Sequence, residues 1–234
     1  MSKYNIPARI LKCAVMLLLA AVFSNQAFSA TAHVAEIGKM VEVGDVIFLD
    51  VKPIPFKKIS EATMSWTNHV GIVVDVSGNE PIVAESTFPF SKKTSWSKFV
   101  RRSENGRVAV YRMQQPLKED QRAALLKAVE KRLNIHYDTG FDLHSKGQFC
   151  SRFVHEVVAE STGTELGEVE TFRTIFKNNP KAGLAFWRAW YFGSVPWERQ
   201  TVTPASVLRS RHLKPVFDGS VTFGDIKSVA ESAL

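Results

Sequence analysis

The stretch GQFCSRFVHEVVAESTG, from Gly147 to Gly163, decides how the rest of the chain is interpreted. Its apolar residues recur at helical spacing and Gly163 is a natural C-terminal stop, so the stretch predicts an amphipathic helix with Cys150 in its first turn. Unpaired backbone N–H groups and the helix dipole at that position favour a thiolate over a thiol. Cys150 is therefore a candidate nucleophile, although a cysteine next to two phenylalanines is also typical of an inert core residue.

The N-terminal segment has the features of a secretory signal peptide. A basic start (Lys3, Arg9 and Lys12) precedes a short apolar run, and small residues between positions 27 and 32 offer two cleavage sites. We expect an exported protein, periplasmic or secreted, in three parts: a signal peptide at residues 1–30, a catalytic domain at residues 31–218 and a flexible tail at residues 219–234. Because the apolar run is too short for a comfortable spanning helix, we expect no stable membrane insertion after cleavage.

Composition excludes several classes of function. The chain has 234 residues, of which 45% are hydrophobic and 23% charged, as is ordinary for one globular domain. Removing residues 1–30 takes away three Lys/Arg and no Asp/Glu, which lowers the formal net charge from +7 to +4. No basic block interleaved with aromatic residues is found, so we expect no nucleic-acid partner. A single remaining cysteine allows neither an intramolecular disulfide nor a structural zinc site, and no cofactor or metal is predicted. The oligomeric state stays open.

The remaining chain alternates strand and helix signals. Apolar, β-branched runs at residues 44–51, 69–76, 81–86 and 107–113 predict strands, and the second and third of them predict an antiparallel hairpin. Residues 117–134 predict an amphipathic helix that buries Leu126, Val129 and Leu133. Thr31 to Val41 is interpreted as a loose lead-in. The aromatic stretch from Phe186 to Trp197 is interpreted as a packed helix and a turn, with an apolar wall for a lipid-like substrate as the less favoured interpretation.

The predicted hairpin places a histidine opposite a carboxylate. With a period of two, His69 and Gly71 share one face of their strand, and Glu85 lies on the next strand. Glu85 could therefore hold the tautomer and orientation of the imidazole. Gly71 beside His69 is expected to leave space for another group to approach the imidazole. Each residue alone is more often structural. Tyr137 and Gln148 are candidates to donate a hydrogen bond to a developing oxyanion, with the same reservation.

These motifs together resemble the circularly permuted branch of the NlpC-type papain-like superfamily, and most closely the YebB/YiiX/YaeF-like proteins. The resemblance rests on GD before an apolar strand, HVGIV at a strand start and FCSRFV at a helix start, and it covers residues 43–213. It implies an α+β, circularly permuted papain-like fold with the catalytic helix packed on an antiparallel sheet. It also implies that Cys150 is the nucleophile, His69 the base, Glu85 the third member and Tyr137 part of the site.

Three functions remain open at this stage. The first is a thiol-dependent amidase or peptidase that acts through a thioester, with cell-wall peptide as one candidate substrate. The second is a lipid acyltransferase or acyl hydrolase that uses the same site. The third is a binding protein without turnover. The expected partner is accordingly a small-molecule, peptide or lipid substrate.

Overall fold

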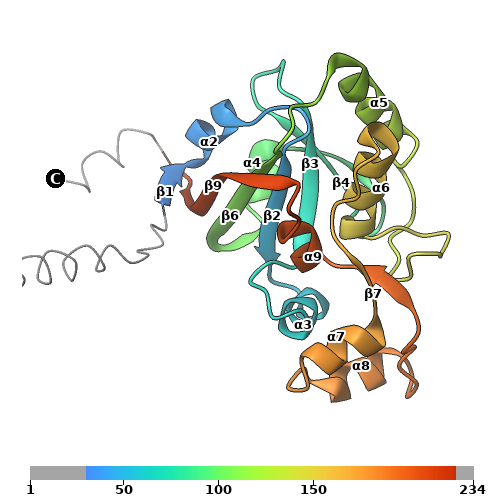
Figure 1. Ribbon diagram of the computed structural model, residues 1–234. Coiled ribbons are helices and arrows are strands. Elements are labelled where there is room, and N and C mark those ends of the chain that lie inside the picture. Colours follow the sequence, from blue (N-terminus) through green and yellow to red (C-terminus); the bar gives the residue numbers. More distant parts are fainter. Residues whose placement is uncertain (1–29, 225–234) are drawn as a thin grey trace, which may run out of the picture.

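A mixed seven-stranded sheet organises the computed structural model, which describes residues 30–224. The strands lie in the order β1-β9-β6-β2-β3-β4-β5, and all neighbours are antiparallel except β1 and β9 (Figure 1). The strand bounds are β1 Ala30–His33, β2 Val46–Val51, β3 His69–Asp75, β4 Ile82–Glu85, β5 Lys92–Ser95, β6 Ser103–Met113 and β9 Leu213–Thr222. The predicted hairpin is formed by β3 and β4.

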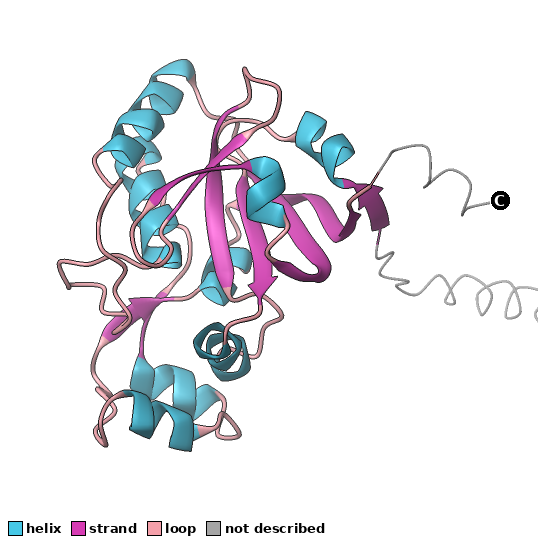
Figure 2. Cartoon of the chain, turned by 180° about the vertical axis from the view of Figure 1, so that it is seen from behind, coloured by secondary structure: helices cyan, strands magenta, loops and turns pink. Residues whose placement is uncertain are grey.

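Helices cover both faces of this sheet (Figure 2). Along β2 the alternate residues Val46 and Phe48 face one core while Ile47 and Leu49 face a second. This alternation follows from the period of two in a strand that is buried on both sides. The helix bounds are α2 Val34–Met40, α3 Ile54–Ala62, α4 Trp96–Val100, α5 Glu119–Glu130, α6 Cys150–Thr162, α7 Phe172–Asn178, α8 Leu184–Trp190 and α9 Pro204–Leu208. The α+β class predicted from the sequence is confirmed.

Helix α6 lies in the first core, against β3 and α5. On α5 the buried side chains are Leu125, Ala128 and Val129, whereas Leu126 is 39% exposed. The prediction that Leu126 is buried is therefore wrong by one residue. Leu125 and Val129 are four residues apart and lie on the same helical face, which is the face that meets α6.

A small subdomain of α7, α8 and a two-stranded ribbon lies beyond one end of the main sheet, close to α3 (Figure 1). The ribbon pairs β7 (Val169–Thr171) with β8 (Gln200–Val202). The predicted packed helix in the aromatic stretch is α8, in which Trp187 is buried against Phe141 and Phe176.

Two predictions about the ends of the domain are wrong. The expected lead-in contains β1 and α2, and residues 219–222 of the expected tail belong to β9. Both errors involve pairing between segments far apart in the sequence, because β9 lies between β6 and β1 and pairs with each of them. A Cβ atom at Gly219 would collide with the backbone of Ala30, so the close approach of these strands requires glycine. The predicted signal peptide lies, except for Ala30, outside the described residues. Within the described range, no helix combines the length and apolarity needed to span a membrane.

Candidate active site

Cys150 is the first residue of α6, as the sequence predicted. Phe149 precedes it in an extended conformation, and Gly163 ends the helix in the left-handed region at φ 72°. Cys150 is only 2% exposed, and it is the only cysteine of residues 30–224. The helix therefore presents one sulfur at the end where its free N–H groups lie.

His69 begins β3 and lies almost wholly buried, next to the Cys150 sulfur. Its Nε2 atom is 2.7 Å from Oε2 of Glu85, the last residue of β4. Burial alone lowers the pKa of His69, but the adjacent Cys150 and the hydrogen bond and charge of Glu85 outweigh burial and raise it above 6.5. The sequence-predicted Cys150, His69 and Glu85 are thus brought together.

Glu85 holds the imidazole in one tautomer. Burial alone raises the pKa of Glu85, but the hydrogen bond and charge of His69, together with those of Arg102, lower it to about 2. An ionised carboxylate can only accept, so Nε2 of His69 carries the hydrogen of the 2.7 Å contact. In the neutral ring the Nδ1 lone pair is then free for the Cys150 proton, and Nδ1 has no regular hydrogen bond to any described residue.

Arg102 and Thr94 complete the surroundings of Glu85, and sequence reasoning missed both. Nη2 of Arg102 donates to Oε2 over 2.6 Å, and Oγ1 of Thr94 donates to Oε1 over 2.7 Å. The Arg102 guanidinium also lies 5.0 Å from the ring centre of Phe99, whose ring lies 5.7 Å from that of His69. Thr94 lies on β5, the strand after β4. Applying to β5 the same two-residue alternation that was used for β3 and β4 could have identified it. Arg102 follows α4, where no periodic signal points to the site.

Gly71 allows the Phe99 ring to pack beside His69, which differs from the open space that the strand pattern indicated. The sequence suggested that a missing side chain beside His69 leaves space for a group that approaches the imidazole. A Cβ atom at Gly71 would lie 2.7 Å from Val83 and 2.9 Å from Phe99. The space is therefore already filled, and it is the Phe99 ring that uses it.

Tyr137 is placed beside Cys150 by a short backbone ladder. The amide of Gln148 donates to the carbonyl of His136, and the amide of Asp138 donates to the carbonyl of Gln148, each over 2.9 Å. The Tyr137 hydroxyl is buried without a hydrogen-bond partner among the described residues. Burial, followed by the nearby Cys150, raises the pKa of Tyr137 well above 10. Tyr137 is therefore a neutral donor at the site.

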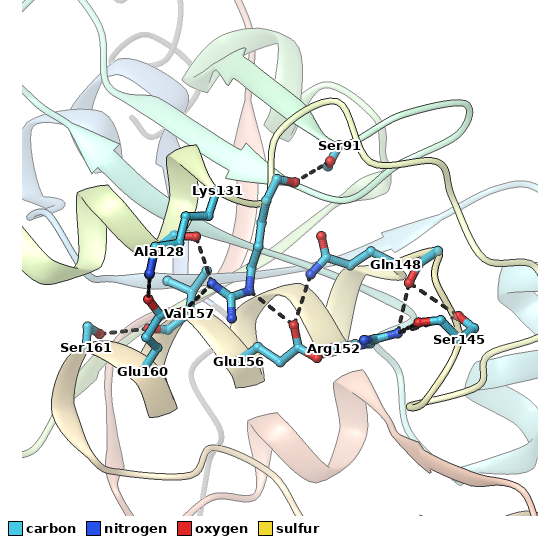
Figure 3. A network of polar contacts seen from close by, with 12 residues as sticks. Ser91, Ala128, Lys131, Ser145, Gln148, Arg152, Glu156, Val157, Glu160 and Ser161 are labelled. Atoms are coloured by element: carbon cyan, nitrogen blue, oxygen red, sulfur yellow. Dashed lines mark hydrogen bonds and ion pairs between the residues drawn. The ribbon is translucent and has the colours of Figure 1, made fainter.

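Gln148, the alternative oxyanion donor, points elsewhere. Its amide nitrogen lies 3.4 Å from Glu156, within a network of charged groups between α5 and α6 (Figure 3). In that network Arg152 binds Glu156 at 2.7 Å and the carbonyl of Gly147 at 2.8 Å. These contacts fix the loop immediately before Cys150. Gln148 thus belongs to the support of the site, and Tyr137 is the better candidate donor.

An apolar chamber of about 480 Å³, counting the part open to solvent, lies against Cys150. Its walls come from α3, α7, α8 and β8, and they include Ile59, Ala62, Phe149, Ile175, Trp187 and Val202. Among the described residues, no charged side chain lines it. Asn179, after α7, donates to the carbonyl of Glu61 on α3 over 2.7 Å and so ties two of the walls together.

Taken together, a helix-initial cysteine, a strand-borne histidine that precedes it in the chain and a carboxylate on the next strand define a permuted papain-like cysteine hydrolase. Residues 40–217 match the profile of the permuted papain-like amidase enzymes, the YaeF/YiiX or C92 family, and the chain belongs to that family. Among solved structures it is similar to the metalloprotein yiiX from Escherichia coli O157:H7, with 27% identity and a TM-score of 0.71 over 77% of this chain and 99% of that one. None of the proteins with curated descriptions matches the chain significantly.

Because this similar protein is described as a metalloprotein, the question arises whether this chain has a metal site. Metal sites in proteins are built from clustered His, Cys, Asp or Glu side chains. Within residues 30–224 no three such side chains lie close enough together to hold an ion. Cys150 and His69 do not complete such a set, so we derive no step through a metal.

Proposed function

We propose that the protein cleaves an amide bond through Cys150, His69 and Glu85 by way of a thioester. His69 takes the Cys150 proton at Nδ1, and the sulfur attacks the carbonyl carbon. The imidazolium then gives a proton to the leaving nitrogen, the C–N bond breaks, and water hydrolyses the thioester to release the acid and regenerate the thiol. Glu85 keeps the ring aligned throughout. The observation that carries this proposal is the buried contact of 2.7 Å between His69 and Glu85 beside the sulfur.

Tyr137 supports the same proposal at the carbonyl oxygen. A tetrahedral intermediate carries an oxyanion, which needs donors that are already in position. The Cys150 backbone N–H is one such donor because it lies in the first turn of α6, where no carbonyl of the helix accepts from it. The unpartnered Tyr137 hydroxyl supplies a second.

The test is capture of the acyl-enzyme. Wild type, Cys150→Ser and His69→Ala are incubated with peptidoglycan fragments and with simple N-acyl anilides, and intact mass reports acylation. We expect a mass gain at Cys150 and release of product in wild type only. Product release by Cys150→Ser at the wild-type rate would refute the proposal. Cell-wall peptide is one candidate substrate. We propose with it that the protein is exported, since that substrate lies outside the cytoplasm.

A second candidate keeps the thioester but passes the acyl group to an acceptor other than water. The observation in its favour is burial, because Cys150 and His69 are 2% and 1% exposed and bulk water has little access to them. Adding an alcohol or amine acceptor and measuring the ratio of transfer to hydrolysis separates the two. A pure binding role is less well supported, since the family is one of amidases and a binding protein needs no ionised Glu85 to hold a histidine.

A further inference from the structure

The chamber beside Cys150 is lined, among the described residues, without any charged side chain, and hydrolysis of an arbitrary amide does not require this. Its polar lining consists of hydroxyl-bearing side chains, chiefly Thr63, Ser151, Thr201 and Thr203, and the rest is aliphatic or aromatic. Of these, Thr201 and Thr203 are buried, and Thr63 and Ser151 already donate to the carbonyls of Ile59 and Val202. A charged group that entered would lose its hydration and find no counter-charge in the wall.

We propose that this chamber binds an apolar acyl group, the part of the substrate that stays on the Cys150 sulfur in the thioester. This inference rests on the proposed function and names its substrate class.

The position of the chamber relative to the two reacting residues selects the acyl part over the leaving part. Cys150 lines the chamber, whereas His69 is not among the described residues that do. The leaving nitrogen must receive its proton from His69 and therefore departs on the imidazole side. The group that remains bonded to sulfur is the one adjacent to the chamber.

Size limits the acyl group. Ligand pockets in proteins commonly have volumes of about 300 to 1,000 Å³, whereas the enclosed space of this chamber is only about 40 Å³, so only a small group fits without the walls moving apart. A short or medium aliphatic chain, or an acyl group of similar bulk, fits these limits better than a charged peptide segment.

The first experiment does not depend on turnover. Alkyl methanethiosulfonates with methyl, butyl and hexyl chains react with Cys150, which forms a disulfide to the alkylthio group while methanesulfinate leaves. Rates are measured by intact mass and divided by the rates with glutathione. We expect an increase of up to about fourfold per added methylene until the chamber is full. Trimethylammonioethyl and sulfonatoethyl reagents should show no such gain.

A variant of the chamber wall makes this test specific. Ala62→Leu adds bulk to the wall from α3 and should abolish the gain of the hexyl rate over the methyl rate of the same variant. Ala123→Leu makes the same change on the exposed side of α5 and should retain the gain. Circular dichroism and thermal melting show whether each variant is folded. If Ala62→Leu does not fold, Ile175→Ala enlarges the chamber instead and should extend the gain to longer chains.

The outcomes separate this inference from the proposed function. Rates that are independent of chain length, or faster for charged reagents, would overturn the chamber assignment even if amides are cleaved. A chain-length gain without any Cys150-dependent amide cleavage would keep the chamber and remove the hydrolase. With active enzyme, kcat/KM for acetyl, butanoyl and hexanoyl 4-nitroanilides should rise with acyl length, and lengthening the amine part of an N-acetyl amide should not raise it.

Discussion

Replacing Glu85 by Gln tests the electrostatic design of the site. The substitution keeps the shape of the side chain and removes its charge. In the folded protein the pKa of Glu85 is lowered from 4.5 to about 2, a difference equivalent to about 3 kcal/mol in favour of the ionised form. The side chain is fully buried, so solvent screening does not reduce this figure.

The direction in which stability changes with pH follows from the difference between the folded-state and unfolded-state pKa of Glu85. A carboxylate with a lowered pKa stabilises the fold above the unfolded-state pKa, and that contribution is lost as the pH falls from about 4.5 towards 2. The contribution of His69 falls outside this window, since its raised pKa acts at pH values above 6.5. Wild type should therefore lose about 3 kcal/mol more than Glu85→Gln when the pH is lowered from about 5.5 to 2.

Urea unfolding at several pH values measures this difference. The lowered pKa values of Glu80, Glu104 and Glu160 act in both proteins and cancel in the comparison. Glu130→Gln, at an exposed pair with Lys93, is the matched control and should follow wild type. Parallel losses of stability in wild type and Glu85→Gln would show that Glu85 is not held ionised by His69 and Arg102.

Four further outcomes are expected. Arg102→Gln should raise the pKa of Glu85, so that the loss of stability on acidification begins at a higher pH. Arg102→Lys should keep the pKa of Glu85 close to its wild-type value, and urea unfolding at low pH measures both variants. Tyr137→Phe should lower kcat by about 10²-fold with little change in thermal stability if the hydroxyl meets the oxyanion, and an unchanged kcat would remove Tyr137 from the mechanism. Because its pKa is raised, His69 should stay protonated above pH 6.5, so the reactive ion pair should be lost only as the pH rises through that raised value, and Glu85→Gln should shift this alkaline limb of kcat/KM to lower pH. If the protein is exported, N-terminal mass analysis should find Ala30 or Thr31 as the first residue, because cleavage after Ala32 would remove most of β1; a start at His33 would contradict this reasoning.

Local patterns were sufficient to predict much of the site. The helix that starts at Cys150 follows from apolar spacing, and the pairing of His69 with Glu85 follows from the period of two in a hairpin. Both depend on residues that are near one another in sequence or on adjacent strands. The approach of Cys150 to His69 was expected only from the family resemblance, because no local rule connects residues 81 positions apart.

The features that were predicted wrongly or missed depend instead on segments that are far apart in the sequence. β1 has only four residues and pairs only with β9, which is separated from it by most of the chain, and β9 itself lies against β6, so neither strand can be predicted from its own stretch of sequence. Arg102 reaches Glu85 from the end of α4 by side-chain length rather than by periodicity. The chamber is assembled from α3, α7, α8 and β8, none of which shows by itself what space the others enclose.

The pairing of β1 with β9 has a practical consequence. Both strands lie at the same edge of the sheet, away from the end where α3, α7 and α8 gather (Figure 1). The backbone thus enters and leaves the folded body on the side remote from the cysteine and its apolar hollow. Attaching a bead or a reporter to the folded domain at residue 30 or residue 224 should leave substrate entry unobstructed.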